Sequence, residues 1–329
     1  MKMASLRTGA RDGALALVSR DLKSVAPAGH IVPTLQAALD AWERHAPALE
    51  DLYRRLNAGA VREVLPFDPA ALEAPLPRAY QFLDGSAYLS HVDLVRRARG
   101  AEMPPSFRAD PLMYQAVSDG FLGPGDDIVI ADEAWGWDFE GELAVILGDT
   151  PIATGAAAAG RYIRLLMLVN DISLRALIPA EVAKGFGFVV SKPRSACSPV
   201  AATPDELAPA WDGRKLHLPL RVHLNGRLVG HPDAGVDMDF DFPRLIEHAA
   251  RTRPLAAGTI IGSGTVSNRD RASGACCLAE LRAQEMLAEG AARTPYLKPG
   301  DRVRIEMPGP DGVSIFGAID QAVVRRGPA

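Results

Sequence analysis

Two glutamates separated by a single residue could share a bound cation. They lie in Asp138-Phe-Glu140-Gly-Glu142, and the alternation of side chains along a strand would place Glu140 and Glu142 on one face. Two carboxylates so close repel each other unless a cation or a proton lies between them. One interpretation is an exposed acidic strand face, because paired surface acids are common. The apolar continuation from Leu143 to Leu147 favours a buried strand instead.

Two aspartates elsewhere in the chain could add ligands to the same cation. Asp171 follows the apolar run Leu165 to Val169, where it would either cap a helix beginning near Ser173 or supply a third oxygen ligand. Asp84 precedes His91 by seven residues, and neither residue alone indicates a site. The two aspartates and the two glutamates would together form a set of four carboxylates. Such a set suits Mg²⁺, Ca²⁺ or Mn²⁺ and argues against zinc, which prefers nitrogen and sulfur ligands.

A lysine and a glycine-rich segment complete the candidate chemistry. Lys192 lies between apolar residues and a proline. It is either a surface side chain with a buried stem or, near a metal, the group that neutralises developing negative charge. Gly262-Ser-Gly-Thr265 follows an apolar pair and is typical of a tight turn after a strand. The segment lacks the lysine of a P-loop and the spacing of a dinucleotide fingerprint, which argues against nucleotide binding.

The composition limits the classes of protein that can carry these residues. The 329 residues are 48% hydrophobic and 23% charged, as in soluble globular proteins, and they allow two domains. The net charge of −4 argues against a nucleic-acid partner, whose protein surface should be basic. The longest strongly apolar run is far shorter than the roughly 20 residues of a spanning helix, so no membrane association is expected. Three cysteines, and an N-terminus without the apolar region of a signal peptide, predict reduced thiols and a cytoplasmic protein.

The elements that must position these side chains fall into two parts. In the first part, a turn at Arg11 to Gly13 separates short strands, and a helix is predicted to follow Thr34 and to end near Asn57 to Gly59. Residues 60–78 are rich in proline and alanine, which indicates a linker. We place a domain boundary near residue 72, which gives a small N-terminal domain of residues 1–72 and a larger domain of residues 73–329.

The second part is predominantly β. Asn225-Gly226 between two apolar runs predicts a hairpin with a type I′ turn. Helices are predicted after Pro243 and from about Leu278 to Leu287. Strands outnumber helices and favour antiparallel hairpins, so the expected class is α+β, mainly β. The predicted strands span residues 128–131, 138–147, 164–169, 220–224, 227–229, 302–307 and 313–316.

The motifs, in this order, resemble those of the fumarylacetoacetate hydrolase (fumarylacetoacetase) family, in its bacterial two-domain branch. The match covers roughly residues 78–325, and residues 1–72 resemble the small N-terminal domain of the longer members. The resemblance implies a mixed β-sandwich roll as the catalytic domain, a homodimer and a bound divalent cation, with Mg²⁺ preferred over Ca²⁺ or Mn²⁺. The motifs that carry it are Asp84 to His91, Asp138-Phe-Glu140-Gly-Glu142, Asn170-Asp171-Ile-Ser, Ser191-Lys192-Pro193 and Gly262-Ser-Gly-Thr265-Val-Ser.

The resemblance also implies a role for each candidate side chain. His91 would be the general base that activates water, oriented by Glu280, with Glu285 as the alternative partner. An arginine after the histidine would contact the substrate; Arg99 is assigned, and Arg97 competes for that place. The metal ligands would be Asp84, Glu140, Glu142 and Asp171, with Lys192 as a further catalytic residue and Tyr114 and Thr265 as substrate contacts.

The implied activity is metal-dependent hydrolysis of the C–C bond of a 1,3-diketo acid, such as fumarylacetoacetate or an acylpyruvate, in the catabolism of aromatic compounds. A metal that chelates a 1,3-dicarbonyl would polarise it and hold it in place. The alternatives are a 2-oxo acid decarboxylase or isomerase that stabilises an enolate with the same metal, and a catalytically silent family member. Gly85, Ser86 and Ile178 depart from the pattern of the animal-type enzymes, so the substrate pocket is expected to differ from theirs.

Overall fold

A long mixed sheet forms the centre of the computed structural model, which describes residues 1–327. Its eleven strands run in the order β4-β3-β2-β1-β13-β10-β9-β16-β5-β6, and β12 pairs with β10 beside this path. All neighbours are antiparallel except β16 and β5, which are parallel. The strands are β1 (Lys2–Leu6), β2 (Ala14–Val18), β3 (Ser24–Pro27), β4 (Leu65–Pro66), β5 (Phe82–Gly85), β6 (Met113–Ala116), β9 (Gly141–Leu147), β10 (Ile163–Asn170), β12 (Ala196–Cys197), β13 (Ala201–Ala202) and β16 (Ile260–Gly262).

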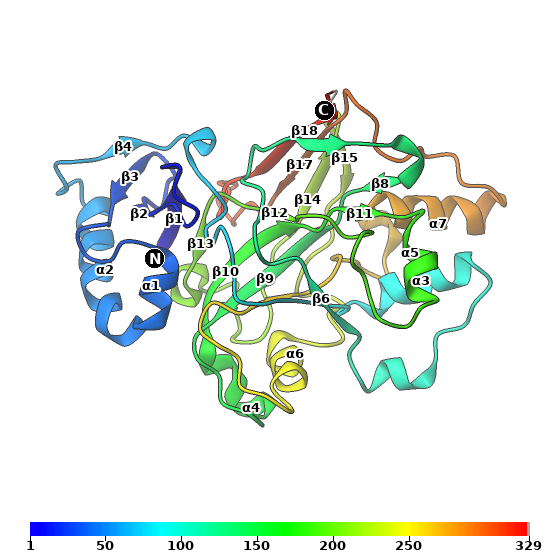
Figure 1. The fold of residues 1–329 in the computed structure, drawn as a ribbon, viewed down its shortest axis with the longest axis horizontal. Coiled ribbons are helices and arrows are strands. Elements are labelled where there is room, and N and C mark those ends of the chain that lie inside the picture. The colour runs from blue at the N-terminus through cyan, green and yellow to red at the C-terminus, as the bar shows by residue number, and fades with distance from the viewer. Residues whose placement is uncertain (328–329) are drawn as a thin grey trace.

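The N-terminal part packs two helices on one end of this sheet (Figure 1). The expected single helix is two: α1 (Leu35–Asp40), whose first turn is capped by the Thr34 side chain, and α2 (Trp42–Asn57). The break falls at Ala41, whose backbone is not helical, whereas Pro47 lies inside α2. Strand β1 pairs with β13, so the sheet continues from the N-terminal part into the rest of the chain. The division into residues 1–72 and 73–329 stays a prediction.

A second sheet of five strands packs against the central sheet. Its order is β15-β14-β17-β18-β7. Asn225 and Gly226, with φ of 52° and 78°, make the tight hairpin turn between β14 and β15. The predicted strand at residues 313–316 is wrong: only Ser314 makes an isolated bridge, and β17 pairs with the later β18 instead. These strands are β7 (Ile128–Ile130), β14 (Arg221–Leu224), β15 (Arg227–Gly230), β17 (Arg302–Glu306) and β18 (Ile319–Arg325), and a separate pair joins β8 (Trp137–Asp138) to β11 (Ser173–Leu174).

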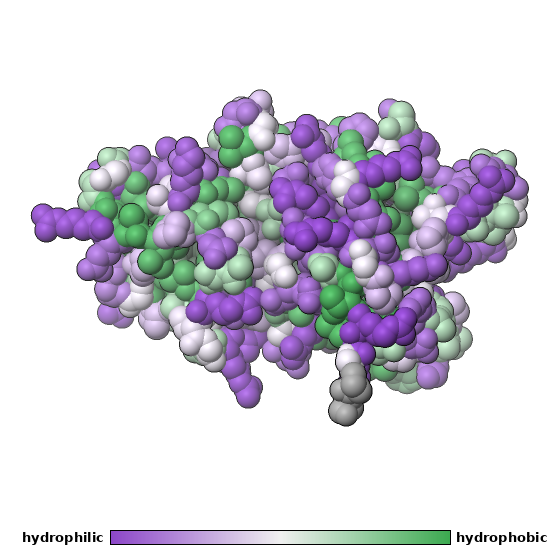
Figure 2. All heavy atoms as spheres, turned by 90° about the horizontal axis from the view of Figure 1, so that it is seen from above, coloured by the Kyte–Doolittle hydropathy of each residue, from purple (hydrophilic) through white to green (hydrophobic). Residues whose placement is uncertain are grey.

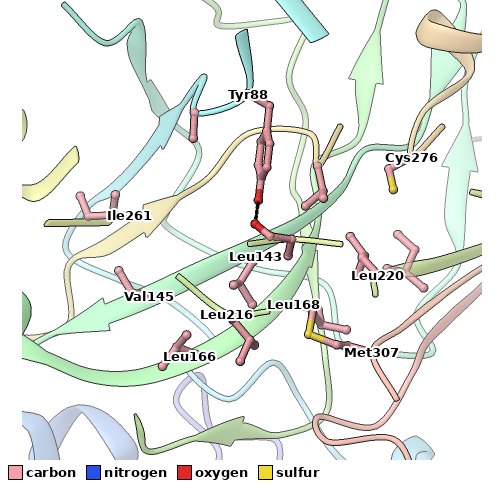
Figure 3. Packing of buried hydrophobic residues seen from close by; sticks show 14 of the residues in the cluster. Tyr88, Leu143, Val145, Leu166, Leu168, Leu216, Leu220, Ile261, Cys276 and Met307 are labelled. Atoms are coloured by element: carbon pink, nitrogen blue, oxygen red, sulfur yellow. Dashed lines mark hydrogen bonds between the residues drawn. The ribbon is translucent and has the colours of Figure 1, made fainter. Parts of the chain in front are cut away.

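Strand alternation divides the central sheet between two apolar cores. Leu143 and Val145 of β9 face the larger core between the sheets, together with Leu166 and Leu168 of β10 (Figure 3). The intervening residues of the same strands face a smaller core that α1 and α2 cover. In the larger core the buried Tyr88 hydroxyl donates to the Ala234 carbonyl oxygen at 2.6 Å. The fold is thus α+β, with mixed sheets and helices.

Four of the remaining helices form two packed pairs. Helices α3 (Leu89–Ala98) and α7 (Leu278–Glu289) pack together, with α5 (Ile178–Val182) drawn near them in Figure 1. Helices α4 (Ala156–Ala159) and α6 (Phe242–Ala249) form a second pair. Hydrophilic side chains are spread over the face shown in Figure 2, with small apolar areas between them. In residues 1–327 no helix has both the length and the apolar character to cross a membrane.

Candidate metal centre and active site

Three carboxylates from three strands of the central sheet converge at its end, with β16 lying between β9 and β5. Asp84 lies in β5, Glu142 in β9, and Asp171 directly follows β10. Each offers one oxygen atom, and these three atoms lie within 4.8 Å of one another. All three side chains are buried. Strand pairing thus brings together acids that are far apart in the sequence, because it places the ends of these strands at the same edge of the sheet.

The alternation of side chains explains why the three carboxylates share one face. Phe82, Ala144 and Val169 lie two residues from Asp84, Glu142 and Asp171 respectively, and all three belong to the smaller apolar core. The intervening residues, such as Gly141, point the opposite way: a Cβ atom on Gly141 would meet the Val222 side chain at 3.0 Å. The acids therefore continue the face that carries the smaller core.

The local electrostatics fit a bound divalent cation. Both carboxylate oxygens of Glu142 are buried and lack any hydrogen-bond partner among the described residues. Burial, and then the Asp84 and Asp171 carboxylates, raise the pKa of Glu142 well above its usual value. Burial and the Asp171 carboxylate likewise raise the pKa of Asp84 to about 8. Three converging carboxylates, of which Glu142 has no hydrogen-bond partner within the described chain, offer the oxygen ligands that a hard cation such as Mg²⁺ or Mn²⁺ requires.

Glu140 borders this group but does not belong to the three. Its carboxylate accepts from Arg175 Nη2 at 2.7 Å and from Lys192 Nζ at 2.6 Å. Burial alone would raise its pKa, but the Arg175 and Lys192 charges outweigh burial and hold the pKa of Glu140 well below its usual value. Its place as a fourth ligand stays a prediction. The sequence reasoning missed Arg175, whose available signal was an arginine four residues after Asp171.

Lys192 and Tyr114 fix the position of Asp171. Lys192 Nζ donates to Asp171 Oδ2 at 2.5 Å, the Tyr114 hydroxyl donates to the same oxygen at 2.6 Å, and Ser195 Oγ donates to Oδ1 at 2.8 Å. Lys192 is 6% exposed, so it is no surface side chain. The alternative of Asp171 as a helix cap is also wrong, because α5 begins only at Ile178 and has no side-chain cap. Tyr114 contacts a candidate metal ligand as well as lining the cavity.

A histidine and a buried glutamate form the second half of the site. His91 Nδ1, on α3, lies 3.0 Å from Glu280 Oε1, on α7. A carboxylate at Nδ1 favours the proton on that nitrogen, which leaves Nε2 free as a base. Glu285 lies elsewhere, where it accepts from the backbone of Arg293 and Thr294.

Asp138 links this pair to the carboxylate cluster. Its carboxylate accepts from the backbone N–H groups of Leu278 and Ala279 at 2.7 and 2.9 Å, which are the first two residues of α7. It also accepts from Arg175 Nε at 2.8 Å. The helix that carries Glu280 is therefore anchored to the same arginine that neutralises Glu140.

A cavity of about 140 Å³ joins the two halves of the site. Thr265 lines it, whereas Arg99 lies exposed at the end of α3 and Arg97 pairs with Asp93 at 3.6 Å, and neither lines it. A larger hollow of about 950 Å³ lies away from the carboxylates, against Arg78 and Arg194. The cavity is lined by Asp84, Gly85, Ser86, Tyr88, His91, Tyr114, Glu140, Glu142, Phe188, Lys192, Gly264 and Thr265.

The glycine-rich segment is required by close packing around Asp84. A Cβ atom on Gly262 would lie 2.3 Å from Asp84 Oδ1, and one on Gly264 would lie 2.3 Å from the Gly85 carbonyl oxygen. Gly264 also has a φ of 72° and donates its N–H to Asp84 Oδ1 at 3.2 Å. The two glycines therefore let the backbone approach Asp84, a candidate metal ligand.

Comparison with protein families gives two matches along the chain. Residues 81–324 match the model described as fumarylacetoacetate (FAA) hydrolase C-terminal, and residues 1–78 match fumarylacetoacetase N-terminal domain 2.

Individual relatives carry more than one activity. The oxaloacetate tautomerase YisK of Bacillus subtilis is 26% identical over 270 residues, which cover 81% of this chain and 79% of that protein. The maleylpyruvate hydrolase of Sphingobium sp. SYK-6, solved with manganese(II) and pyruvate, aligns at a TM-score of 0.65 with 19% identity, over 99% of this chain and all of that one. The fumarylacetoacetate hydrolase of Exiguobacterium antarcticum aligns at 0.67 with 20% identity, over the same shares.

Proposed function

Because the chain belongs to the fumarylacetoacetate hydrolase family, we propose that it hydrolyses the C–C bond of a small 1,3-diketo acid of the acylpyruvate type. The observation that carries the proposal is the His91–Glu280 pair, at 3.0 Å, beside three convergent carboxylates. A positioned base is needed when water attacks a carbonyl carbon. Enolate stabilisation alone, as in a decarboxylase, does not require one.

The residues of the chain divide the reaction between them. His91 Nε2 takes a proton from water, whose oxygen forms a bond to the acyl carbonyl carbon. The bond between that carbon and the adjacent CH₂ then breaks, and its electron pair goes to the departing pyruvate enolate. The proton held by His91 then passes to the former CH₂ carbon of the enolate, so the products are a carboxylate and pyruvate.

A cation held by Asp84, Glu142 and Asp171 would supply Lewis-acid stabilisation of the enolate oxygen. We propose Mg²⁺ as the resident ion, with Mn²⁺ and Ca²⁺ as alternatives; the manganese(II) in the Sphingobium hydrolase supports a divalent cation. Lys192 engages two carboxylates, and its ammonium group has a third N–H that can face developing negative charge. We further propose that two copies of the chain form a homodimer.

The decisive experiment replaces the base and keeps the ligands. We expect His91→Ala to lower the turnover of acetylpyruvate by about 10²–10⁴-fold, the usual contribution of a general base, while Mn²⁺ binding measured by calorimetry stays unchanged. Glu280→Gln should reduce turnover less, because the imidazole remains. His30→Ala, at an exposed position, is the control. Turnover of His91→Ala equal to that of the unmodified enzyme would exclude this mechanism.

A second candidate is tautomerisation of oxaloacetate. One relative, which aligns over 81% of this chain, is an oxaloacetate tautomerase, and the His91–Glu280 pair could equally move a proton at the carbon between two carbonyl groups. The two activities separate cleanly in one assay series. Pyruvate release from acetylpyruvate supports hydrolysis, whereas enol–keto interconversion of oxaloacetate without cleavage of any diketo acid supports the tautomerase.

A further inference from the structure

The loop that leads into Lys192 exposes an unusual number of apolar side chains. Between Val182 and Val190, every residue is exposed except Phe188. Phe186 is 98% exposed and Val189 is 76% exposed. The loop therefore does not fold over its own apolar side chains, and Phe188 is the single ring that it directs inward.

Phe188 forms part of the cavity wall above the carboxylates. Its ring meets that of Tyr114 edge to face, with centroids 4.8 Å apart and planes at 89°. The Tyr114 ring in turn lies 5.4 Å from Lys192 Nζ, and its hydroxyl binds Asp171. Phe188 thus lines the cavity and packs against the same tyrosine that fixes a candidate metal ligand.

The loop is held at both ends and free in the middle. The Glu181 carboxylate accepts from the backbone N–H groups of Val189, Val190 and Ser191 at 2.9–3.0 Å, and from the Ser191 hydroxyl at 2.5 Å. No hydrogen bond joins residues 186–188 to the rest of the described chain. Gly185 precedes this middle part and Gly187 lies within it; their φ angles are 76° and 98°, and both have open space where a Cβ atom would lie. The position of this segment therefore depends on side-chain packing, and the contact of the Phe188 ring with Tyr114 holds the ring in the cavity wall.

The small size of the cavity limits which substrates can fit beside Phe188. At about 140 Å³ it is well below the roughly 300–1,000 Å³ of pockets that take drug-sized ligands. A pyruvate unit bound at the carboxylates leaves little room for a long acyl group while the Phe188 ring stays in place. From these contacts we infer that Phe188 is the specificity-determining residue of the site, and that it selects substrates with a short group attached to the 2-oxo acid. The inference rests on the proposed function for the kind of substrate, but its test does not require turnover.

The test measures binding of unreactive 2-oxo acids to the Mn²⁺-loaded enzyme. Dissociation constants for pyruvate and phenylpyruvate are obtained by calorimetry for the unmodified chain and for Phe188→Ala. We expect the ratio of the two affinities to shift toward phenylpyruvate by about tenfold or more in Phe188→Ala, as for an enlarged apolar pocket. Phe188→Trp should shift the ratio in the opposite direction. Phe186→Ala is the matched control, because this phenylalanine lies in the same loop but faces outward.

The role of Phe188 and the proposed hydrolase activity can be disproved separately. An unchanged ratio in Phe188→Ala, or an equal shift in Phe186→Ala, would overturn the role of Phe188 even if acetylpyruvate is cleaved. A shifted ratio in an enzyme that cleaves no diketo acid would support the role of Phe188 and overturn the hydrolase proposal.

Discussion

The two ends of one sheet face carry opposite chemistry. At one end, Ile146, Met167 and Ile260 are fully buried beneath the N-terminal helices. At the other end, the same strands and their neighbour β5 present Asp84, Glu142 and Asp171, which are equally buried but polar; among the described residues only Asp171 of the three has an ion pair, with Lys192. Burial is thus similar at both ends, and what differs is whether the covering elements bring apolar groups or leave a cavity.

This difference shows how the fold can hold a costly charge cluster. Burying carboxylates without partners costs several kcal/mol for each ion, whereas burying the isoleucine end stabilises the sheet. The apolar end fixes the strand register, and the register places the three acids within 4.8 Å. Arg175 and Lys192 pair with Glu140, and Lys192 also pairs with Asp171, so Asp84 and Glu142 have no ion pair among the described residues.

The largest expected effect comes from the acidic end. We predict that Glu142→Gln lowers affinity for Mn²⁺ by at least about 100-fold, since even residues behind the ligands cost about 10–100-fold when they are changed. Turnover should fall by about 10³-fold or more, because Lewis-acid stabilisation is worth several kcal/mol. Calorimetry and the diketo acid assay measure the two quantities. The metal-free variant should unfold no earlier than the unmodified protein, since a buried ionisable group is gone; a large loss of stability would show that Glu142 supports the fold instead.

The reciprocal change at the apolar end should separate stability from chemistry. We predict that Ile146→Ala lowers the free energy of unfolding by about 2–5 kcal/mol, as for other buried isoleucines. Metal affinity of the folded variant should change by less than about twofold, because sites without shared partners act independently. Urea denaturation and calorimetry at 25 °C provide the two values. A parallel loss of metal affinity would mean that the two ends are coupled through the strands.

A third expected effect is a pH dependence of metal binding. Asp84 has its pKa raised to about 8 in the metal-free fold, so below that pH a metal must displace its proton. Release of the Asp84 proton should therefore raise the affinity for Mn²⁺ by up to about tenfold for each pH unit from pH 6 to 8. The rise should be steeper if Glu142 also releases a proton when the metal binds.

The same raised pKa predicts how stability depends on pH. The metal-free fold binds the Asp84 proton more tightly than the unfolded chain, so this contribution to stability is complete below about pH 4 and is lost as the pH rises through 8. The increase in melting temperature caused by Mn²⁺ should grow over that range, and Asp84→Asn is the control that removes the titrating group. An increase that is the same at pH 6 and pH 9 would contradict the raised pKa.

Much of the site follows from local patterns. Alternation from Glu140 into the start of β9 places Glu140 and Glu142 on the cavity side, and Asn225-Gly226 predicts the hairpin turn that the structure contains. The predicted strand at residues 313–316 shows the limit of such patterns. Its apolar residues have the right period, but the positive φ of Gly312 and Gly317 at its ends and the pairing of β17 with β18 leave it outside the sheet.

What the sequence by itself determined is the set of acids and the periodicity that turns them to one face, because these depend only on residues close together in the chain. The tertiary structure alone decided how charge is shared among them. Arg175 and Lys192 reach Glu140 from 35 and 52 residues away, and Gly264 meets Asp84 across 180 residues. Such contacts depend on strand register and helix packing, which no local pattern encodes. They give Glu140 and Asp171 their positively charged partners and Glu280 its histidine, and they leave the Glu142 carboxylate without a hydrogen-bond partner among the described residues.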